Sequence, residues 1–251
     1  NAASDKFSLA LEAEHNKILD DSTSIASEAD RIVKATEYAE AEVAKFIDKI
    51  ALTITKNAKD SAVLALLDQS NSLLKNYVPE KFESVVAAVE ANFAENEKVQ
   101  SIRKVLEAEK LTSEGNMFVD FEITQPDGTV LKLSDFVGKG KYILVDFWAS
   151  WCGPCKREIP FIKNVYEKYH GDKFDVLSVA VWDKVEDTIA AAEEHGVVWN
   201  QILDAQRIPT ELYAIQGIPT LILFGPDGTI LHRGNSIRGE NLEPTVAKYV
   251  E

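Results

Sequence analysis

Glycine is absent from the first 114 residues of this chain, and that absence limits what the region can fold into. All 12 glycines lie at Gly115 or later, and of the eight prolines only Pro79 precedes them. A β-sandwich or an α/β fold needs turn residues about every 8–12 positions. The region before Gly115 is therefore predicted to be helical, and the remainder, with its Gly and Pro residues, to be a separate domain.

Apolar residues recur every three or four positions in the first part of the chain, as they do on one face of a helix. This spacing predicts a long helix from Ser24 to about Lys56, capped by Asp20, Asp21 or Ser22. Further helices are expected over 4–18, after Asn57, from Pro79 and around 99–106. We interpret 1–112 as a helical bundle of four or five helices, with dimerisation or partner docking as its expected role.

After a predicted linker at 112–116, the pattern changes from helical to alternating. The predicted strands are 118–123, 129–133, 142–148, 174–181, 199–203, 221–224 and 229–233, and the predicted helices are 152–170, 185–195 and 243–250. Strands that alternate with helices and end in a hairpin and a helix are typical of an α/β domain with a mixed sheet. We assign that domain to 116–251.

The charge distribution excludes several classes of partner. The net charge is −14, and both parts of the chain are acidic, so neither has the basic patch that binds phosphate backbones. Nucleic acid and anionic membrane surfaces are therefore not expected as partners, and no apolar run is long enough to span a membrane. Because the chain begins at Asn1 without a methionine, we expect upstream sequence such as a signal peptide.

Both cysteines lie in one short segment, Trp151-Cys152-Gly153-Pro154-Cys155-Lys156, at the junction of a buried strand and a helix. The first turn of a helix has unpaired N–H groups and a partial positive charge, which favour a thiolate at Cys152. Cys155 comes one turn later on the same face, where it can resolve a mixed disulfide. The segment therefore indicates a redox-active dithiol.

Three other interpretations of the two cysteines remain open. Half of a zinc site would need further ligands, and no second pair of Cys or His residues has suitable spacing. A static structural disulfide usually closes a longer loop. Inert core cysteines would not account for Gly153 and Pro154 between them at a helix start. The redox-active dithiol is the interpretation that we favour.

This segment and the Val-Asp-Phe-Trp-Ala strand before it resemble the active-site region of thioredoxins. Gly217-Ile218-Pro219-Thr220 resembles the cis-proline loop of that family. The resemblance implies that Asp146, an acid in a buried strand, accepts the proton of Cys155, and an acid that is only bonded to nearby backbone or water is the open alternative. One departure is that 174–181 has no lysine, whereas many thioredoxins have one beside this acid.

The additional hairpin and the inserted helix and strand resemble TlpA/ResA-type thiol–disulfide oxidoreductases of the AhpC/TSA-like branch. This resemblance implies that Cys152 attacks disulfides of exported proteins and that another dithiol protein supplies electrons. It implies an extracytoplasmic location and no metal or organic cofactor. The expected substrate groove consists of Trp151, Gly153, Pro154, Ile218, Pro219 and Thr220. Further near-site candidates are Lys156, Glu158 and Trp182, although a solvated helix surface for Glu158 and core packing for Trp182 are open alternatives.

Two alternative functions remain. A peroxiredoxin would share the fold, but the positions that correspond to its Pro-x-x-x-Thr/Ser-x-x-Cys pattern are Val145 and Ala149. A binding or assembly protein would use the helical region as its functional part and carry the dithiol domain as an appendage.

Overall fold

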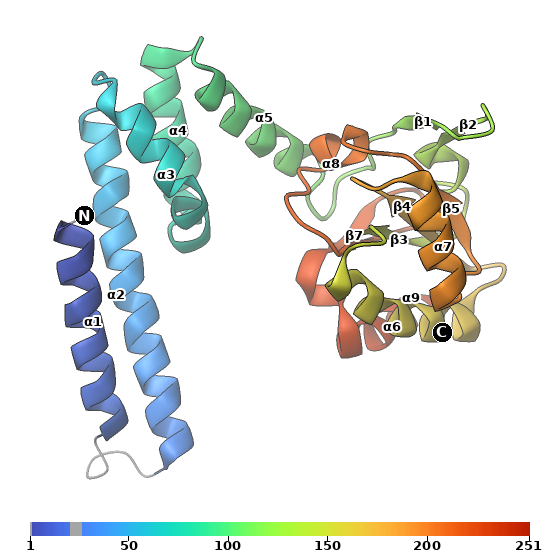
Figure 1. Ribbon diagram of the computed structural model, residues 1–251, viewed down its shortest axis with the longest axis horizontal. Coiled ribbons are helices and arrows are strands. Elements are labelled where there is room, and N and C mark those ends of the chain that lie inside the picture. The colour runs from blue at the N-terminus through green and yellow to red at the C-terminus, as the bar shows by residue number, and fades with distance from the viewer. Residues whose placement is uncertain (1, 21–26) are drawn as a thin grey trace. The chain divides into compact units, whose positions relative to one another are not determined.

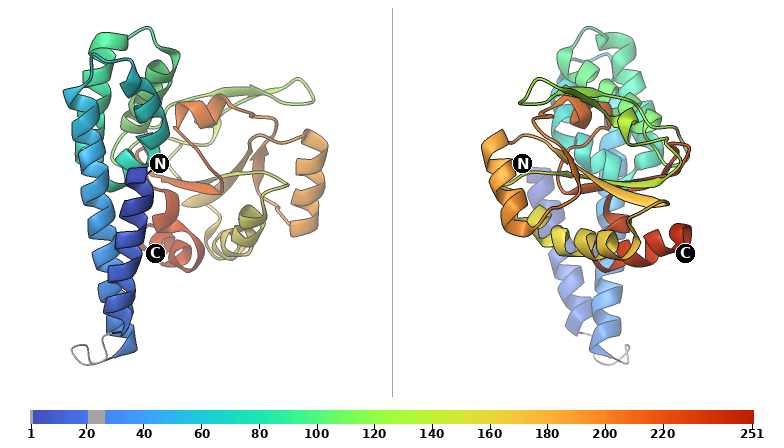
Figure 2. Two further views of the ribbon diagram at one scale, coloured as in Figure 1. Left: turned by 60° about the vertical axis from the view of Figure 1, so that its left-hand side comes forward. Right: turned by 90° about the vertical axis from the view of Figure 1, so that its right-hand side faces the viewer.

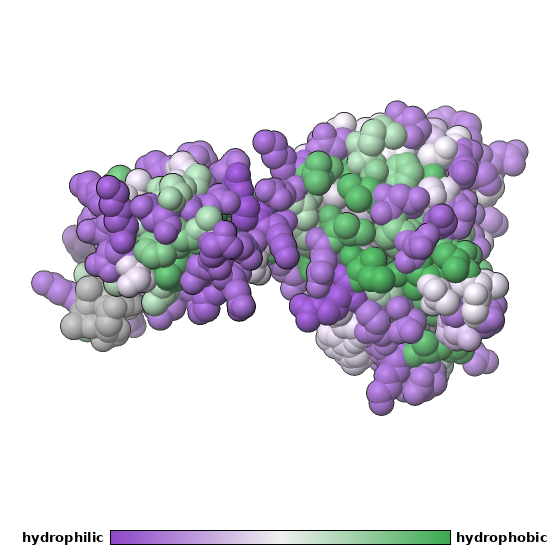
Figure 3. All heavy atoms as spheres, turned by 90° about the horizontal axis from the view of Figure 1, so that it is seen from above, coloured by the Kyte–Doolittle hydropathy of each residue, from purple (hydrophilic) through white to green (hydrophobic). Residues whose placement is uncertain are grey.

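The computed structural model of the protein describes residues 2–20 and 27–251. The chain divides into two compact units, Asn1–Arg103 and Lys104–Glu251, and the boundary falls within helix α5 (Glu97–Leu111) (Figure 1). On the face drawn in Figure 3, hydrophilic side chains are common and groups of apolar side chains lie among them. Within the described ranges, no helix is both long and apolar enough to cross a membrane.

The first unit is helical, as the absence of glycine predicts. It contains α1 (Ala2–Asp20), α2 (Glu28–Lys56), α3 (Ala62–Tyr77), α4 (Pro79–Phe93) and the start of α5. Helix α2 contacts α1, α3 and α4, and α3 contacts α4. Buried aliphatic side chains form the core of these contacts; they include Ile47, Ile54, Leu67, Leu74 and Val86.

The start of α2 differs from the prediction. Its N-cap is Ser27, whose hydroxyl accepts a hydrogen bond from the backbone N–H of Asp30 at 3.1 Å. Asp20, one of the predicted caps, is instead the last residue of α1. The predicted start at Ser24 and the other two predicted caps, Asp21 and Ser22, lie outside the described residues.

The second unit contains a mixed five-stranded sheet with the order β5-β4-β3-β6-β7, which confirms the predicted sheet. The central strand β3 pairs in parallel with β4 and antiparallel with β6. Strands β1 and β2 form a separate antiparallel hairpin, as predicted. The strands are β1 (Glu122–Thr124), β2 (Val130–Lys132), β3 (Tyr142–Trp148), β4 (Phe174–Ala180), β5 (Asn200–Ile202), β6 (Thr220–Phe224) and β7 (Ile230–Arg233).

Helices α6 (Gly153–Tyr169), α7 (Val185–His195) and α9 (Leu242–Val250) cover one face of this sheet, and the hairpin, the short helix α8 (Ile208–Leu212) and loops cover the other (Figure 2). Helices α6, α7 and α9 contribute to a buried cluster with Leu144 and Trp148 of β3. The alternate β3 residues, Val145 and Phe147, pack in a second cluster with the hairpin. Since side chains alternate along a strand, Asp146 belongs to the face that α6 covers.

Two predicted details of the second unit are wrong. The first strand was expected at 118–123 but begins at Glu122, because the Tyr213 hydroxyl bonds both the N–H and the C=O of Val119. Those backbone groups therefore do not pair with a neighbouring strand. Helix α8 (Ile208–Leu212) was not predicted, since its five residues are too short to show a periodic pattern.

The C-terminal end of α5 is attached to the sheet of the second unit. The Arg233 guanidinium of β7 donates hydrogen bonds of 2.7 Å to the carbonyl and the hydroxyl oxygens of Thr112, which is fully buried. The backbone N–H of Arg233 donates to Glu114 at 3.0 Å. The short 3₁₀ segments η1 (Leu133–Asp135), η2 (Gly234–Ile237) and η3 (Gly239–Asn241) complete the unit.

Candidate active site

A disulfide joins Cys152 and Cys155 at the N-terminus of α6, with an S–S distance of 2.02 Å. Cys152 is the N-cap of this helix, and the backbone N–H of Cys155 points to Cys152 Sγ at 3.1 Å. Cys155 is 1% exposed and Cys152 is 3% exposed. In the reduced protein the same N–H can stabilise a thiolate at Cys152, as the sequence predicts.

The predicted cis-proline loop lies against the disulfide. The Ile218–Pro219 peptide bond is cis, and the carbonyl oxygen of Ile218 is 3.7 Å from Cys152 Sγ. Pro219 is buried, and Thr220 begins β6 opposite Phe147 of β3. The Thr220 hydroxyl donates to the carbonyl of Gly217 at 2.8 Å, which closes the loop. The structure thus brings this loop and Cys152 together.

Two tryptophans flank the dithiol. Trp151 is 60% exposed, and its indole N–H donates to the carbonyl oxygen of Trp182 at 3.0 Å. Trp182 follows β4 with a positive φ of 54°, which is uncommon for a bulky residue and is found at functional sites. Its ring also packs against the second buried cluster. Trp182 therefore combines the core packing and the near-site position that the sequence left as alternatives.

Asp183 holds the loop that precedes Cys152, although the sequence does not single it out. Its carboxylate accepts hydrogen bonds from the backbone N–H of Ser150 at 2.6 Å and from the Ser150 hydroxyl at 2.9 Å. It also accepts one from the Thr188 hydroxyl at 2.8 Å. Its place directly after Trp182 was the available signal, but the partner Ser150 is 33 positions away.

Asp146 is buried on the side of the sheet that α6 covers. Burial and then the negative charge of Glu158 raise the pKa of Asp146 to about 7, while the Ser178 hydroxyl and the positive charge of Arg238 act in the opposite direction. Its Oδ2 lies 3.5 Å from the Ser178 hydroxyl, and its Oδ1 is buried without a hydrogen-bond partner. A carboxyl group with this pKa can gain or lose a proton near neutral pH.

Glu158 is buried in α6, so the alternative of a solvated helix surface is wrong for this residue. Its carboxylate accepts a hydrogen bond of 2.5 Å from the backbone N–H of Gly239. It also accepts one of 3.4 Å from Arg238 Nε. Glu158 lies one helical turn after Cys155, which places a fixed negative charge close to Asp146. The other predicted site residues of α6, Gly153, Pro154 and Lys156, lie in its first turns nearer the surface.

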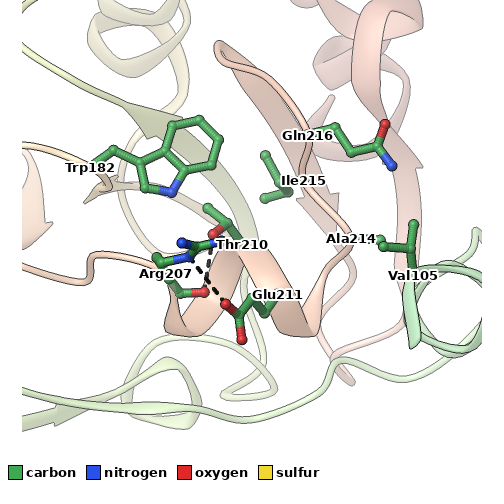
Figure 4. A pocket seen from close by; sticks show the side chains of 8 residues that line it. All are labelled: Val105, Trp182, Arg207, Thr210, Glu211, Ala214, Ile215 and Gln216. Atoms are coloured by element: carbon green, nitrogen blue, oxygen red, sulfur yellow. Dashed lines mark hydrogen bonds and ion pairs between the residues drawn. The ribbon is translucent and has the colours of Figure 1, made fainter. Parts of the chain in front are cut away.

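A pocket of about 460 Å³ opens beside the segment that leads to Pro219 (Figure 4). The Trp182 ring forms one wall, and the ion pair between Arg207 and Glu211 (3.2 Å) lies at its edge. Two non-glycine residues with positive φ, Trp182 and Ala214, are among its lining residues. The other lining residues are Val105, Thr210, Ile215 and Gln216.

Comparison with known proteins agrees with this geometry. Residues 115–233 match the model of the AhpC/TSA family. The thiol-disulfide oxidoreductase ResA of Bacillus subtilis is 29% identical over 119 residues, which are 47% of this chain and 65% of the relative. ResA of Geobacillus kaustophilus is 30% identical over 116 residues, 46% of this chain and 66% of the relative. The match thus spans slightly less than two thirds of these relatives.

Among solved structures, the thioredoxin domain of a thiol-disulfide oxidoreductase from Bacteroides vulgatus is 32% identical, with a TM-score of 0.49. The match covers 55% of this chain and 99% of that domain. The family found is the one that the sequence motifs resemble. Residues 115–233 are thus similar to the AhpC/TSA family, and relatives that match this part of the chain are named thiol-disulfide oxidoreductases.

Proposed function

We propose that this protein reduces disulfides in exported proteins by thiol–disulfide exchange. The observation that carries the proposal is the Cys152–Cys155 pair at the start of α6, with the Cys155 N–H directed at Cys152 Sγ. In this proposal a substrate segment approaches Cys152 on the side of the Ile218 carbonyl, whose oxygen is 3.7 Å from the same sulfur. The family relatives are named for the same chemistry.

The reaction begins with the reduced dithiol. The Cys152 thiolate attacks one sulfur of the substrate disulfide, which forms a mixed disulfide and releases the other substrate sulfur as a thiolate that takes up a proton. Cys155 then loses its proton and attacks Cys152 Sγ. This second step forms the Cys152–Cys155 bond, breaks the mixed disulfide and releases the second substrate sulfur, which is also protonated. Another dithiol protein returns the two electrons, and the cycle needs no metal or organic cofactor.

Asp146 is the proposed proton acceptor for Cys155. It belongs to the face of the sheet that α6 and Cys155 cover, and its raised pKa of about 7 matches a group that exchanges protons at neutral pH. Glu158 is a positioning residue in this proposal, because its negative charge contributes to that pKa and Arg238 and Gly239 hold it in place.

The proposed substrate groove combines exposed and backbone groups around Cys152. The exposed ring of Trp151 and the backbone of the cis-proline loop contact the substrate segment. The pocket that Trp182 lines also includes Ala214, Ile215 and Gln216, which precede the cis-proline loop in the chain. In this proposal its apolar walls accept a substrate side chain. The proposed groove residues are Trp151, Gly153, Pro154, Ile218, Pro219 and Thr220.

We further propose an extracytoplasmic location, since the TlpA/ResA-type motifs resemble those of exported enzymes. For residues 1–112 we propose a helical bundle that docks a partner or a second copy of the chain. The extensive contacts of α2 with its neighbouring helices support a unit with its own core.

The test is reduction of insulin disulfides with dithiothreitol as electron source. Cys152→Ser should abolish the activity, because it removes the sulfur that attacks the substrate and the remaining cysteine, Cys155, is buried in the first turn of α6. Cys155→Ser should accumulate a mixed disulfide with the substrate through Cys152, detectable by mass spectrometry. Residual turnover of the Cys152→Ser protein would exclude the proposed mechanism.

The physiological direction of electron flow needs a separate measurement. A reduction potential of the Cys152/Cys155 couple near about −270 mV would support a reductase, whereas one near about −120 mV would indicate an oxidant.

A further inference from the structure

Ser178 lies directly opposite Asp146 in the parallel pairing of β4 with β3. Both side chains are buried, with 1% and 2% exposure. They share one face of the sheet, because Val176 of β4 and Leu144 of β3 belong to the cluster that contains Cys155. The position opposite the buried acid is thus occupied by a hydroxyl group.

The orientation of this hydroxyl is set by Trp199. The indole N–H of Trp199 donates a hydrogen bond of 2.8 Å to Ser178 Oγ. An indole nitrogen has no acceptor function, so the Ser178 oxygen is the acceptor and its own proton remains for a second partner. Asp146 Oδ2, at 3.5 Å, is that partner. Trp199 is itself buried, and its ring packs against Tyr166 with a centroid distance of 5.4 Å.

The other groups around Asp146 do not replace this contact. Helix α6 contributes Cys155 and the negative charge of Glu158. The segment between η2 and η3 contributes the positive charge of Arg238. On the other neighbouring strand, β6, the apolar residue Leu221 lies opposite Asp146. Within the described part of the chain, the Ser178 hydroxyl is the hydrogen-bond donor to the Asp146 carboxyl, whose Oδ1 has no partner.

We propose that Trp199 and Ser178 are positioning residues for the resolving step: Trp199 aims the Ser178 hydroxyl at Asp146, and that hydroxyl stabilises the carboxylate that accepts the Cys155 proton. A hydrogen bond to the charged form of an acid favours that form. Without the hydroxyl, burial and Glu158 would leave a smaller fraction of Asp146 ionised at neutral pH. This inference rests on the proposed role of Asp146 as proton acceptor.

The direct test is the titration of Asp146 in the oxidised full-length chain, followed by NMR of ¹³C-labelled aspartate carboxyl groups. Ser178→Ala should raise the titration midpoint of Asp146 by about one pH unit, as expected for the loss of one hydrogen bond to a charged group. Trp199→Phe should raise it by less, because the hydroxyl remains but loses its fixed direction. Ser178→Thr keeps a hydroxyl and should restore the wild-type midpoint.

Ser70→Ala is the matched control. Ser70 is also a buried serine, but it belongs to α3, where its hydroxyl donates to the carbonyl of Leu66 at 2.6 Å. This variant should leave the titration of Asp146 unchanged. The inference is overturned if Ser178→Ala leaves the midpoint unchanged or lowers it, or if Ser178→Thr shifts it as far as Ser178→Ala does.

The kinetic consequence separates this inference from the proposed function. In Ser178→Ala, a midpoint near pH 8 would reduce the ionised fraction at pH 7 from about one half to about one tenth, and release from the mixed disulfide should slow about fivefold. The rate should recover as the pH rises through 8.5. If Asp146→Asn does not slow this release, the proposed role of Asp146 fails. If Asp146→Asn slows the release but Ser178→Ala changes neither the titration midpoint of Asp146 nor the release rate, only the proposed positioning role of Trp199 and Ser178 fails.

Discussion

The two units of this protein differ in the polar side chains that they bury and in the hydrogen bonds of those side chains. Within the described residues of the helical unit, Ser70 is the buried polar residue, and its hydrogen bond stays within its own helix. The second unit buries Asp146, Glu158 and Ser178 together, and their contacts join α6, two strands and the segment before η3. A unit whose core is purely apolar tolerates substitution but contains no buried reactive groups. Burying polar groups costs free energy of folding, but their hydrogen bonds hold reactive groups in defined positions.

The largest expected effect concerns the cost of burying Asp146. An acid whose pKa rises from 3.8 to about 7 on folding destabilises the protein as the pH increases through that range, because the unfolded chain has already released the proton. The cost is absent below about pH 4 and complete above about pH 7. Asp146→Asn should therefore raise the free energy of unfolding at pH 8 by up to about 4 kcal/mol.

Urea denaturation of the oxidised proteins at pH 4.5 and pH 8 checks this prediction. All four tryptophans lie in the second unit, so their fluorescence reports on that unit alone. The increase in the free energy of unfolding caused by Asp146→Asn should be much smaller at pH 4.5 than at pH 8. An equal gain at both values would mean that the substitution acts through packing and that the carboxyl group of Asp146 does not carry the cost.

The second prediction concerns the apolar core of the first unit. Leu67 of α3 is 1% exposed, and Leu67→Ala should lower the stability of the helical unit by about 3 kcal/mol. Far-UV circular dichroism should show an earlier loss of helix on heating. The tryptophan unfolding curve and the rate of insulin reduction should both stay at their wild-type values. A parallel loss in both would show that the two units unfold as one.

Sequence patterns were sufficient to predict those parts of the structure that depend on contacts between residues close together in the chain. The apolar period predicted the helices of the first unit, and the segment from Trp148 to Cys155 predicted the strand, the helix start and the dithiol. Glu158 was identified as a candidate because the segment that follows Cys155 resembles that of TlpA/ResA-type enzymes. In each case the residues that form the pattern lie within a few positions of one another in the sequence.

Contacts between distant segments could not be predicted in the same way. The pairing of Ser178 with Asp146 depends on the register of two parallel strands, and a shift by one residue would place Ser178 on the other face. Arg238 reaches Glu158 across 80 positions, and Tyr213 bonds Val119 across 94. These polar contacts determine the environment of Asp146 and the late start of β1, and a single sequence carries no periodic signal for them.

The third prediction concerns where the second unit begins. Arg233 bonds Thr112 and Glu114, and the backbone N–H of Gly115 donates to Ile230 at 2.8 Å. A fragment of residues 104–251 keeps these contacts, whereas a fragment of 116–251 leaves the half-buried Arg233 with fewer partners. The shorter fragment should be less stable by about 2 kcal/mol in tryptophan-monitored urea denaturation. Equal stability of both fragments would show that the end of α5 contributes nothing to the fold.

The smallest expected effect tests the helical unit at a single hydrogen bond. Ser27→Ala removes the side chain that caps α2 and should lower the thermal stability of the helical unit by about 1 kcal/mol. Ser61→Ala is the matched control, because Ser61 occupies the N-cap position of α3 without a side-chain capping bond. Circular dichroism should register a loss for Ser27→Ala and none for Ser61→Ala. Equal losses in the two variants would mean that the capping bond at Asp30 does not stabilise α2. Insulin reduction should be unchanged in both, since neither serine belongs to the unit that carries the dithiol.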